Sequence, residues 1–338
     1  MSMSEGSERS MEHRSYFLFP LNGEAVRFNP NPVCSSTLAV ATSISGSFGH
    51  MKVFRFNSDH SLLDHVHDIY SAVGLTACAW SPLRQDHIAS THNGHGCVFM
   101  LNTRTRSIAW HPPPGHAHAS IVTALEWDPH GRETLVSGSW DSTIKLWTPY
   151  SAAGCISTMH NPNIAHVTGV SWGPIPWNGF ASVSYNGSLC LWDPRMRTLA
   201  SELARGEHAF SCCDWSKASS SCYIATGSCS GLIKVWDMRG SREPVSAWQG
   251  HDNKRVRGVR FSPSVQNVIA SFSTGSEVCM WSDVTTVEAQ LARKYSMHTG
   301  SIKGIDMSTD GVLASIGSDY KLITIVYAHD RQEVEVAQ

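Results

Sequence analysis

Histidine, serine and aspartate side chains recur along this chain of 338 residues in sets that could carry out hydrolytic chemistry. The clearest set is His118, Ser137 and Asp141, with Trp147 close behind. In a hydrolase of this kind the serine attacks, the histidine takes its proton and the aspartate orients the histidine. A nucleophile is needed only once, whereas similar sets recur several times here. The recurrence favours a structural role, in which an imidazole bonds to a carboxylate and a buried indole N–H finds an acceptor.

Two groups of histidines have side chains that could ligate a metal. They are His92, His95 and Cys97, and separately His111, His116 and His118. Zinc needs a preorganised tetrahedral set, usually with a second close pair elsewhere in the chain. No partner pair has metal-like spacing, and Gly94, Gly96 and the prolines at 112–114 mark mobile or extended loops. No glycine-rich nucleotide-binding loop is present either. We therefore predict no metal, no cofactor and no enzymatic activity.

The elements that position these side chains are short β runs that repeat. Residues 135–147 contain two runs, 135–139 and 144–147, on either side of a polar turn at 140–143. Clear copies of this layout occupy residues 182–193, 226–237 and 271–281, and weaker copies occupy 42–54, 91–101 and 315–325. One such hairpin cannot bury both of its faces, so neighbouring copies must pack together.

Each copy follows another β run, which ends in an aromatic residue or methionine. The seven run ends are Phe28, Trp80, Trp127, Trp172, Trp215, Phe261 and Met307, which are 43 to 52 residues apart. Three visible strands with room for a fourth at this period are typical of a β-propeller of WD-repeat type. The sequence therefore predicts an all-β fold of seven four-stranded antiparallel blades. Such a ring exposes no long edge strand.

The third repeat has the most complete set of polar side chains. Its His118, Ser137, Asp141 and Trp147 resemble the structural tetrad of the WD-repeat family. Other repeats keep only parts of that set. They hold His160 or His166 with Ser182, Asn186 and Trp192; His208 with Thr226, Ser230 and Trp236; His251 with Ser271, Gly275 and Trp281; and His298 with Ser315, Asp319 and Ile325.

The last repeat lacks an obvious outer strand. Tyr16–Phe19 is a short apolar run outside every repeat, and we predict that it closes the ring, although Glu333–Val336 competes for this position. The expected organisation is a disordered tail at 1–13, one propeller at 14–330 and a C-terminal tail at 331–338.

The composition narrows the functional class. A net charge of −2 gives no basic field, so nucleic acid is not an expected partner. No apolar run approaches 18 residues, and no stable membrane insertion is expected. The ten cysteines lack any C-x-x-C pair, which fits a reducing compartment. A rigid interaction platform, with its function on the loops at the ring mouth, is the favoured interpretation.

Several stretches resemble the receptors for the type 2 peroxisomal targeting signal, within the WD-repeat family. They are residues 135–147, 170–176 with 180–182, 211–215, 236–239 with 243–245, and 28–30 with 38–42. The resemblance covers the first six repeats in order and the seventh loosely. It implies a non-enzymatic cytoplasmic receptor that cycles to the peroxisome or glycosome matrix. Its partners would be cargo proteins with an N-terminal type 2 signal, a peroxin co-receptor and docking machinery.

The implied signal is an amphipathic helix that lies across the mouth of the ring, with apolar anchors in a cleft and an acidic residue for its arginine. Side chains next to the turns are predicted to point there: His92, Trp140, Tyr185, Cys229, Thr274 and Ser318. Trp140 and Tyr185 are adjacent in blade order and are of the type enriched at binding hot spots. The competing function is a generic adaptor of a ubiquitin ligase or chromatin complex.

The sequence departs from the family where the cargo arginine should be met. The resemblance implies acidic side chains near the starts of blades two and three, but Ala77 and Ile121 stand there. Three acids on the mouth side are alternatives, although a solvated loop charge is the favoured interpretation of each one alone. They are Glu207, Asp252 and Glu24.

Overall fold

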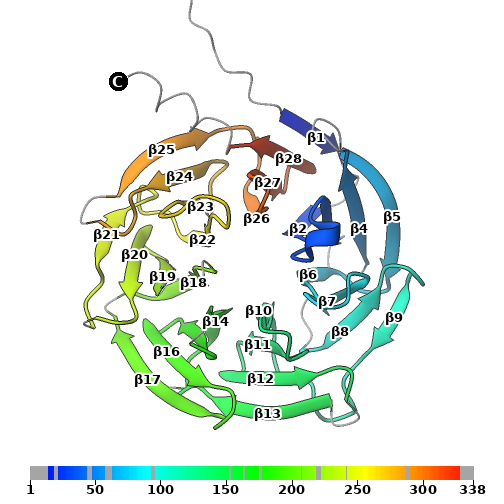
Figure 1. The fold of residues 1–338 in the computed structure, drawn as a ribbon, viewed down its shortest axis with the longest axis horizontal. Coiled ribbons are helices and arrows are strands. Elements are labelled where there is room, and N and C mark those ends of the chain that lie inside the picture. The colour runs from blue at the N-terminus through cyan, green and yellow to red at the C-terminus, as the bar shows by residue number, and fades with distance from the viewer. Residues whose placement is uncertain are drawn as a thin grey trace, which may run out of the picture.

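The computed structural model describes residues 14–18, 22–43, 48–57, 63–92, 96–151, 154–162, 164–174, 177–206, 208–217, 222–240, 242–286 and 289–327. Within these ranges, strands β1 to β28 form seven four-stranded antiparallel sheets that radiate from a central axis (Figure 1). The fold is a seven-bladed β-propeller, and the architecture predicted from the repeat is confirmed.

The first four blades follow the chain in order, each from its inner to its outer strand. Blade one has β2 (Asn22–Phe28), β3 (Thr37–Ser43), β4 (Gly49–Phe56) and β5 (Leu63–Ser71). Blade two has β6 (Leu75–Trp80), β7 (His87–His92), β8 (Val98–Asn102) and β9 (Ser107–Trp110). Blade three has β10 (Val122–Trp127), β11 (Leu135–Ser139), β12 (Thr143–Thr148) and β13 (Gly154–His160). Blade four has β14 (Val167–Trp172), β15 (Phe180–Ser184), β16 (Ser188–Asp193) and β17 (Thr198–Arg205).

The remaining blades repeat this layout, and the last one uses both ends of the described chain. Blade five has β18 (Phe210–Trp215), β19 (Tyr223–Ser228), β20 (Leu232–Asp237) and β21 (Ser246–Gln249). Blade six has β22 (Val256–Phe261), β23 (Ile269–Ser273), β24 (Val278–Ser282) and β25 (Gln290–Tyr295). Blade seven has β26 (Ile302–Met307), β27 (Val312–Gly317), β28 (Lys321–Val326) and β1 (Arg14–Leu18). A short 3-10 helix, η1 (Pro32–Cys34), follows β2.

The N-terminal strand closes the ring. β1 pairs antiparallel with β28, in a register that runs from Arg14 opposite Ile325 to Leu18 opposite Lys321. This is the closure predicted for the Tyr16–Phe19 run, although the strand begins earlier and Phe19 lies outside the described residues. The competing segment 333–336 and the two predicted tails also lie outside them. The Phe17 ring then packs edge-on against Phe54 of blade one, with 5.2 Å between centroids.

The aromatic residues that end the inner strands join neighbouring blades. The indole N–H of Trp80 donates to the carbonyl of Arg27 in the preceding blade, at 3.1 Å. Trp127 and Trp172 repeat this bond one and two blades further on, to the carbonyls of Ala79 and Glu126. Each ring therefore fills the space between two sheets while its polar N–H remains satisfied. This explains why the repeat places a large aromatic residue at that position.

Each inner strand also has a β-bulge near its start, where the pairing register shifts. In blades three to five the bulge residue carries a hydroxyl that donates to a carbonyl of the next blade. Thr123 bonds the Val167 carbonyl at 2.7 Å, Thr168 bonds that of Phe210 at 2.9 Å, and Ser211 bonds that of Val256. In blades six, seven and one the equivalent residue is charged: Arg257, Lys303 and Glu24.

In the part of the chain that the structure describes, no helix is long and apolar enough to cross a membrane. All ten cysteines are free thiols, and four of them are buried: Cys78, Cys190, Cys213 and Cys279. Burial raises the pKa of the Cys78 and Cys190 thiols to about 12. These side chains therefore act as small apolar groups in the core.

Candidate functional site

The hydrolase-like set of blade three forms one continuous chain of hydrogen bonds. His118 lies between Asp141, with Nδ1 2.9 Å from Oδ2, and Ser137, with Nε2 2.7 Å from Oγ. The Trp147 indole N–H donates to the same Ser137 Oγ at 2.8 Å. Asp141 also accepts from the backbone N–H groups of Ala119 and Thr143. The carboxylate thus fixes the loop before β10 to the turn between β11 and β12.

The same geometry argues against nucleophilic chemistry at Ser137. Its side chain is completely buried, and its Oγ already accepts the indole N–H of Trp147. Burial lowers the pKa of His118, which therefore stays neutral near pH 7. In this state Nδ1–H donates to Asp141 and Nε2 accepts from the serine hydroxyl. The serine hydroxyl and both imidazole nitrogens are therefore engaged inside the sheet, as expected of a structural network.

Other blades keep different portions of this network. In blades four to six the indole donates to a hydroxyl: Trp192 to Ser182 at 2.8 Å, Trp236 to Thr226 at 3.0 Å and Trp281 to Ser271 at 2.8 Å. In blade six His251 also bonds Ser271, at 2.8 Å. In blade seven His298 bonds both Ser315 and Asp319, each at 2.9 Å.

The histidine proposed for blade four was wrong. His160 is exposed at the end of β13 and makes no bond to Ser182. His166 is also exposed, and its Nδ1 bonds the backbone carbonyl of Trp140 in blade three instead. In blade five His208 is exposed, so that blade keeps only the Thr226–Trp236 pair. The short loops before β14 and β18 point these rings outward, and sequence spacing alone does not reveal that direction.

The described members of the two histidine groups do not converge on a metal site. His111 and His116 are exposed and bond only the nearby carbonyls of Pro112 and Pro114, while His118 is engaged in the blade-three network. His95 lies outside the described residues. Among the residues that are described, no cluster of three histidine, cysteine or carboxylate side chains could hold a metal ion.

Five of the predicted mouth residues occupy equivalent positions in five blades. In each, the backbone N–H donates to the carbonyl of the residue immediately before the blade's inner strand. Trp140 bonds Ile121, Tyr185 bonds His166, Cys229 bonds Ala209, Thr274 bonds Arg255 and Ser318 bonds Ser301. Equivalent turns of successive blades lie at the same face of the ring, so these residues share one rim. His92 differs, because its N–H faces the Cys97 carbonyl at 3.4 Å.

Among these predicted residues, Trp140 and Tyr185 have large exposed side chains, with 43% and 53% of their surface accessible. His166 lies between them. Its ring stacks obliquely on Trp140, with centroids 5.4 Å apart, and its carbonyl accepts from the N–H of Tyr185. His166 therefore contacts both residues across blades three and four, Trp140 through its ring and Tyr185 through a backbone hydrogen bond. Sequence reasoning had offered His166, as an alternative to His160, for the hydrogen-bonded set of blade four.

Three further apolar side chains are exposed on the same rim and were not singled out from the sequence. They are Phe48, Ile164 and Tyr320, which are 58%, 87% and 46% accessible. Phe48 precedes β4, Ile164 lies in the loop before β14, and Tyr320 follows Asp319 in the turn of blade seven. The available signal was an apolar residue inside a turn that is otherwise polar. We call Phe48, Trp140, Ile164, Tyr185 and Tyr320 the apolar rim.

The acidic candidates for the cargo arginine differ in their surroundings. Glu24 is half-buried, and burial raises the pKa of its carboxyl, while Lys303 and Arg257 lower it. These two cations already oppose its charge. Asp252 is exposed beside β22, and Glu207 lies outside the described residues. Ala77 and Ile121 are both half-buried near the start of their inner strands.

Comparisons with known proteins agree with this geometry. The WD domain, G-beta repeat model matches residues 111–148, 202–237 and 242–282. A peroxisomal targeting signal 2 receptor from Schizosaccharomyces pombe is 26% identical over 309 residues, which is 89% of this chain and 95% of that protein. A receptor of the same description from Dictyostelium discoideum is 32% identical over 76 residues, which is 22% of this chain and 24% of that protein.

A second class of relative matches part of the chain. The histone acetyltransferase type B subunit 2 of Candida glabrata is 23% identical over 210 residues, 61% of this chain and 49% of that protein. Because relatives of different function share the repeat, the similarity alone does not select one role. Together with the seven radial sheets and the blade-three hydrogen bonds, these matches identify the chain as a WD-repeat β-propeller.

Proposed function

We propose that this propeller is a non-enzymatic receptor for the type 2 peroxisomal targeting signal. It binds the signal helix of cargo proteins at the apolar rim and, with a co-receptor, delivers them from the cytoplasm to the peroxisome or a related organelle. The observation that carries the proposal is the similarity to a receptor of that description over 89% of the chain. A fold by itself would carry less, because propellers serve many functions.

The rim supports this assignment on physical grounds. An amphipathic helix needs exposed apolar anchors that are held rigidly, and Trp140 and Tyr185 supply them with few rotatable bonds. His166 supports both through its ring and its carbonyl. The remaining rim residues on blades one and seven would contact the distal part of the signal or the co-receptor.

The signal arginine is assigned to Asp252 or Glu207 rather than Glu24. Glu24 already lies between Lys303 and Arg257, so a third cation would gain little there. Asp252 is exposed in the loop before β22, where its carboxylate is open to a cation of the cargo, and among the described residues Lys294 is the one cation seen to sense its charge. The attraction is solvent-exposed, so the affinity should fall with salt as the Debye length shortens to about 8–10 Å at 0.1–0.15 M.

The test is peptide binding to the purified full chain, with and without a peroxin co-receptor. A labelled Arg-Leu-x5-His-Leu helix is titrated by fluorescence anisotropy against a control peptide with the arginine substituted. Trp140→Ala and Tyr185→Ala should each weaken binding about tenfold or more, as is usual for a buried aromatic anchor.

Trp177→Ala is the matched control. Trp177 is also a partly exposed tryptophan, 36% accessible, but it lies in the loop between β14 and β15 on the opposite face. It should leave peptide affinity unchanged. Loss of peptide binding with Trp177→Ala but not with Trp140→Ala would show that the site lies on the face opposite the apolar rim. Absence of signal-dependent binding in the wild-type chain with any co-receptor would favour the alternative role.

That alternative is a WD-repeat adaptor within a larger complex. The similarity to a histone acetyltransferase subunit over 61% of the chain is the observation in its favour. Co-purification from cells distinguishes the two roles. A receptor should recover peroxisomal matrix proteins in a manner that depends on their N-terminal signal, whereas an adaptor should recover a fixed set of subunits.

A further inference from the structure

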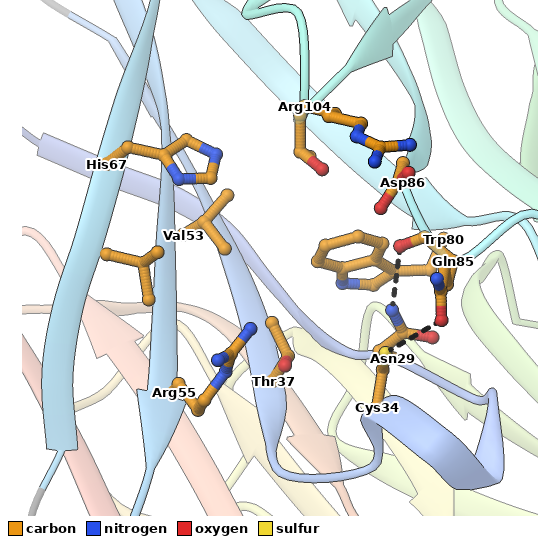
Figure 2. A pocket seen from close by; sticks show the side chains of 12 residues that line it. Asn29, Cys34, Thr37, Val53, Arg55, His67, Trp80, Gln85, Asp86 and Arg104 are labelled. Atoms are coloured by element: carbon orange, nitrogen blue, oxygen red, sulfur yellow. Dashed lines mark hydrogen bonds between the residues drawn. The ribbon is translucent and has the colours of Figure 1, made fainter.

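A second recess lies on the face of the ring opposite the apolar rim, between blades one and two. Its volume is about 320 Å³, and its walls come from the loops after β2, β6 and β8 and from the outer part of blade one (Figure 2). These loops leave the blades at the end away from the turns that carry Trp140 and Tyr185. This volume falls at the small end of the range for small-molecule sites.

The basic groups of the recess lack acidic partners. Figure 2 shows Arg55, near the end of β4, reaching into the space, with His67 of β5 facing it. Nε2 of His67 is buried and has no hydrogen-bond partner. Asp64 lies opposite Arg55 in the β4–β5 register. Among the described residues, however, no carboxylate comes within ion-pairing distance of Arg55. A buried nitrogen without a partner is costly, so the recess favours an occupant that can bond it.

Comparison with other blades shows why the charge of Arg104, at the edge of the recess, is not neutralised. In blades four and five the turn after the third strand holds an arginine that pairs with an aspartate two residues earlier. Arg195 bonds Asp193 at 3.0 Å, and Arg239 bonds Asp237 at 2.8 Å. In blade two the equivalent pair is Arg104 and Asn102. The amide of Asn102 accepts the N–H groups of the turn, as the aspartates do, but supplies no charge.

Arg104 therefore stands at the upper rim of the recess with only Asp86 near it in Figure 2, and no ion pair joins these two described residues. Arg106 adds a further positive charge near His67. Burial first, and then Arg106, lowers the pKa of that imidazole. Three guanidinium groups therefore lie around the recess, and none of them forms an ion pair with the nearby described carboxylates of Asp86 and Asp64. A third carboxylate, Asp68, raises the pKa of His67 but is itself paired with Lys52. Guanidinium groups bind carboxylates and phosphates in a planar, two-point geometry.

Part of the remaining wall is apolar. Trp80, Val53 and Val66 border the space, and the Trp80 indole N–H is already bonded to the Arg27 carbonyl. That ring therefore offers only its apolar surface. Val53 is buried, whereas Val66 is 42% exposed at the opening. An occupant that fits both kinds of wall has an apolar body and one anionic end.

We propose that this recess is a second binding site, for a small anion that carries a carboxylate or phosphate group on an apolar body. Arg55 and His67 Nε2 bond the anionic group, Arg104 attracts it at the rim, and Trp80 with the two valines covers the apolar part. The site is independent of the import role, because it lies on the other face and shares no residue with the apolar rim.

Isothermal titration calorimetry of the full chain tests this proposal with three probes of similar size: phenyl phosphate, phenylacetate and benzyl alcohol. At least one of the two anions should bind with 1:1 stoichiometry, and the alcohol should not. Comparison of the two anions tells whether phosphate or carboxylate is preferred. Arg55→Gln should weaken the anion about tenfold or more, since a charge-assisted bond is lost.

Arg195→Gln is the control, because it removes an arginine from the matching loop of blade four. It should leave probe affinity unchanged. A second variant, Asn102→Asp, keeps the acceptor for the turn but supplies the missing partner of Arg104, and should weaken binding several-fold with the fold intact. The proposal is overturned if neither anion binds saturably, if benzyl alcohol binds equally well, or if Arg55→Gln and Arg195→Gln behave alike.

Discussion

Blades three and six share three of the four polar side chains that link a blade's loops to its strands, and they differ in the fourth. Both have a histidine bonded to a serine and a tryptophan indole bonded to the same serine. Blade three adds Asp141, which accepts from His118. Blade six has Gly275 at that position. In both turns a serine hydroxyl accepts from the N–H two residues later, Ser139 from that of Asp141 and Ser273 from that of Gly275. The two turn backbones are therefore equivalent.

The difference teaches which part of the network the fold requires. The indole–hydroxyl bond is present in blades three to six, whereas the carboxylate is present only in blades three and seven. Blade seven even has Ile325 where the tryptophan would be, and its sheet still forms. Strand pairing and apolar packing between blades therefore hold the ring together. The carboxylate adds local stability, and in blade three it raises the pKa of His118 against the larger, opposite effect of burial.

The largest expected effect is loss of the complete network. Asp141→Ala leaves the imidazole of His118 and the backbone donors of Ala119 and Thr143 without their acceptor. We expect the free energy of unfolding to fall by about 1–3 kcal/mol, because the buried imidazole loses its charged partner and two less buried backbone N–H groups lose their acceptor. Equilibrium denaturation in urea measures it. A loss no larger than that of an exposed surface variant would contradict the structural role of the carboxylate.

The next effect is a pH dependence that blade six should show. Burial lowers the pKa of His251 to about 4, whereas an unfolded histidine titrates near 6.5. Between these values the unfolded state binds the extra proton, so stability is full above pH 6.5 and is lost as the pH falls toward 4. The expected loss from this residue is about 2 kcal/mol between pH 7.5 and pH 5.

Chemical denaturation of the wild type and of His251→Gln across this pH range isolates that contribution. The variant should be less stable at pH 7.5 but should show a shallower decline on acidification. Parallel curves for the two proteins would mean that His251 is not the group responsible.

Installing the missing carboxylate should make blade six resemble blade three. Gly275 has no left-handed backbone, and a Cβ there would make only ordinary contacts with Ser273 and Lys254. Gly275→Asp should therefore be accommodated, should raise the pKa of His251 and should stabilise the fold by about 1 kcal/mol. Nuclear magnetic resonance titration of the imidazole measures the pKa. An unchanged His251 titration would show that the side chain does not reach the ring.

The smallest effect is expected in blade five, where the carboxylate position holds Ser230. Its hydroxyl bonds only the Ser228 hydroxyl, at 2.9 Å, near the surface. Ser230→Ala should cost no more than about 0.5 kcal/mol, as is usual for surface substitutions. A urea midpoint shift as large as that of Asp141→Ala would remove the basis for ranking the blades.

The repeat made most of the fold predictable. A hairpin that cannot bury its two faces alone must stack on copies of itself, so seven run ends at a nearly constant period imply seven blades. The closing strand was predictable for the same reason, since the last copy lacked an outer strand and an apolar run remained at the N-terminus. The blade-three network followed from residue types at fixed offsets within one repeat unit.

Features between repeats were decided only by the tertiary structure. His166 was one of two histidines expected in the hydrogen-bonded set of blade four, yet it bonds the Trp140 carbonyl of the preceding blade and its ring packs on that of Trp140. The recess near Arg55 and His67 likewise depends on loops of two blades. Local sequence determines strands, turns and their period through propensity and side-chain alternation. Which side chains meet across a gap depends on loop directions and blade packing, and these are set by the closed ring as a whole.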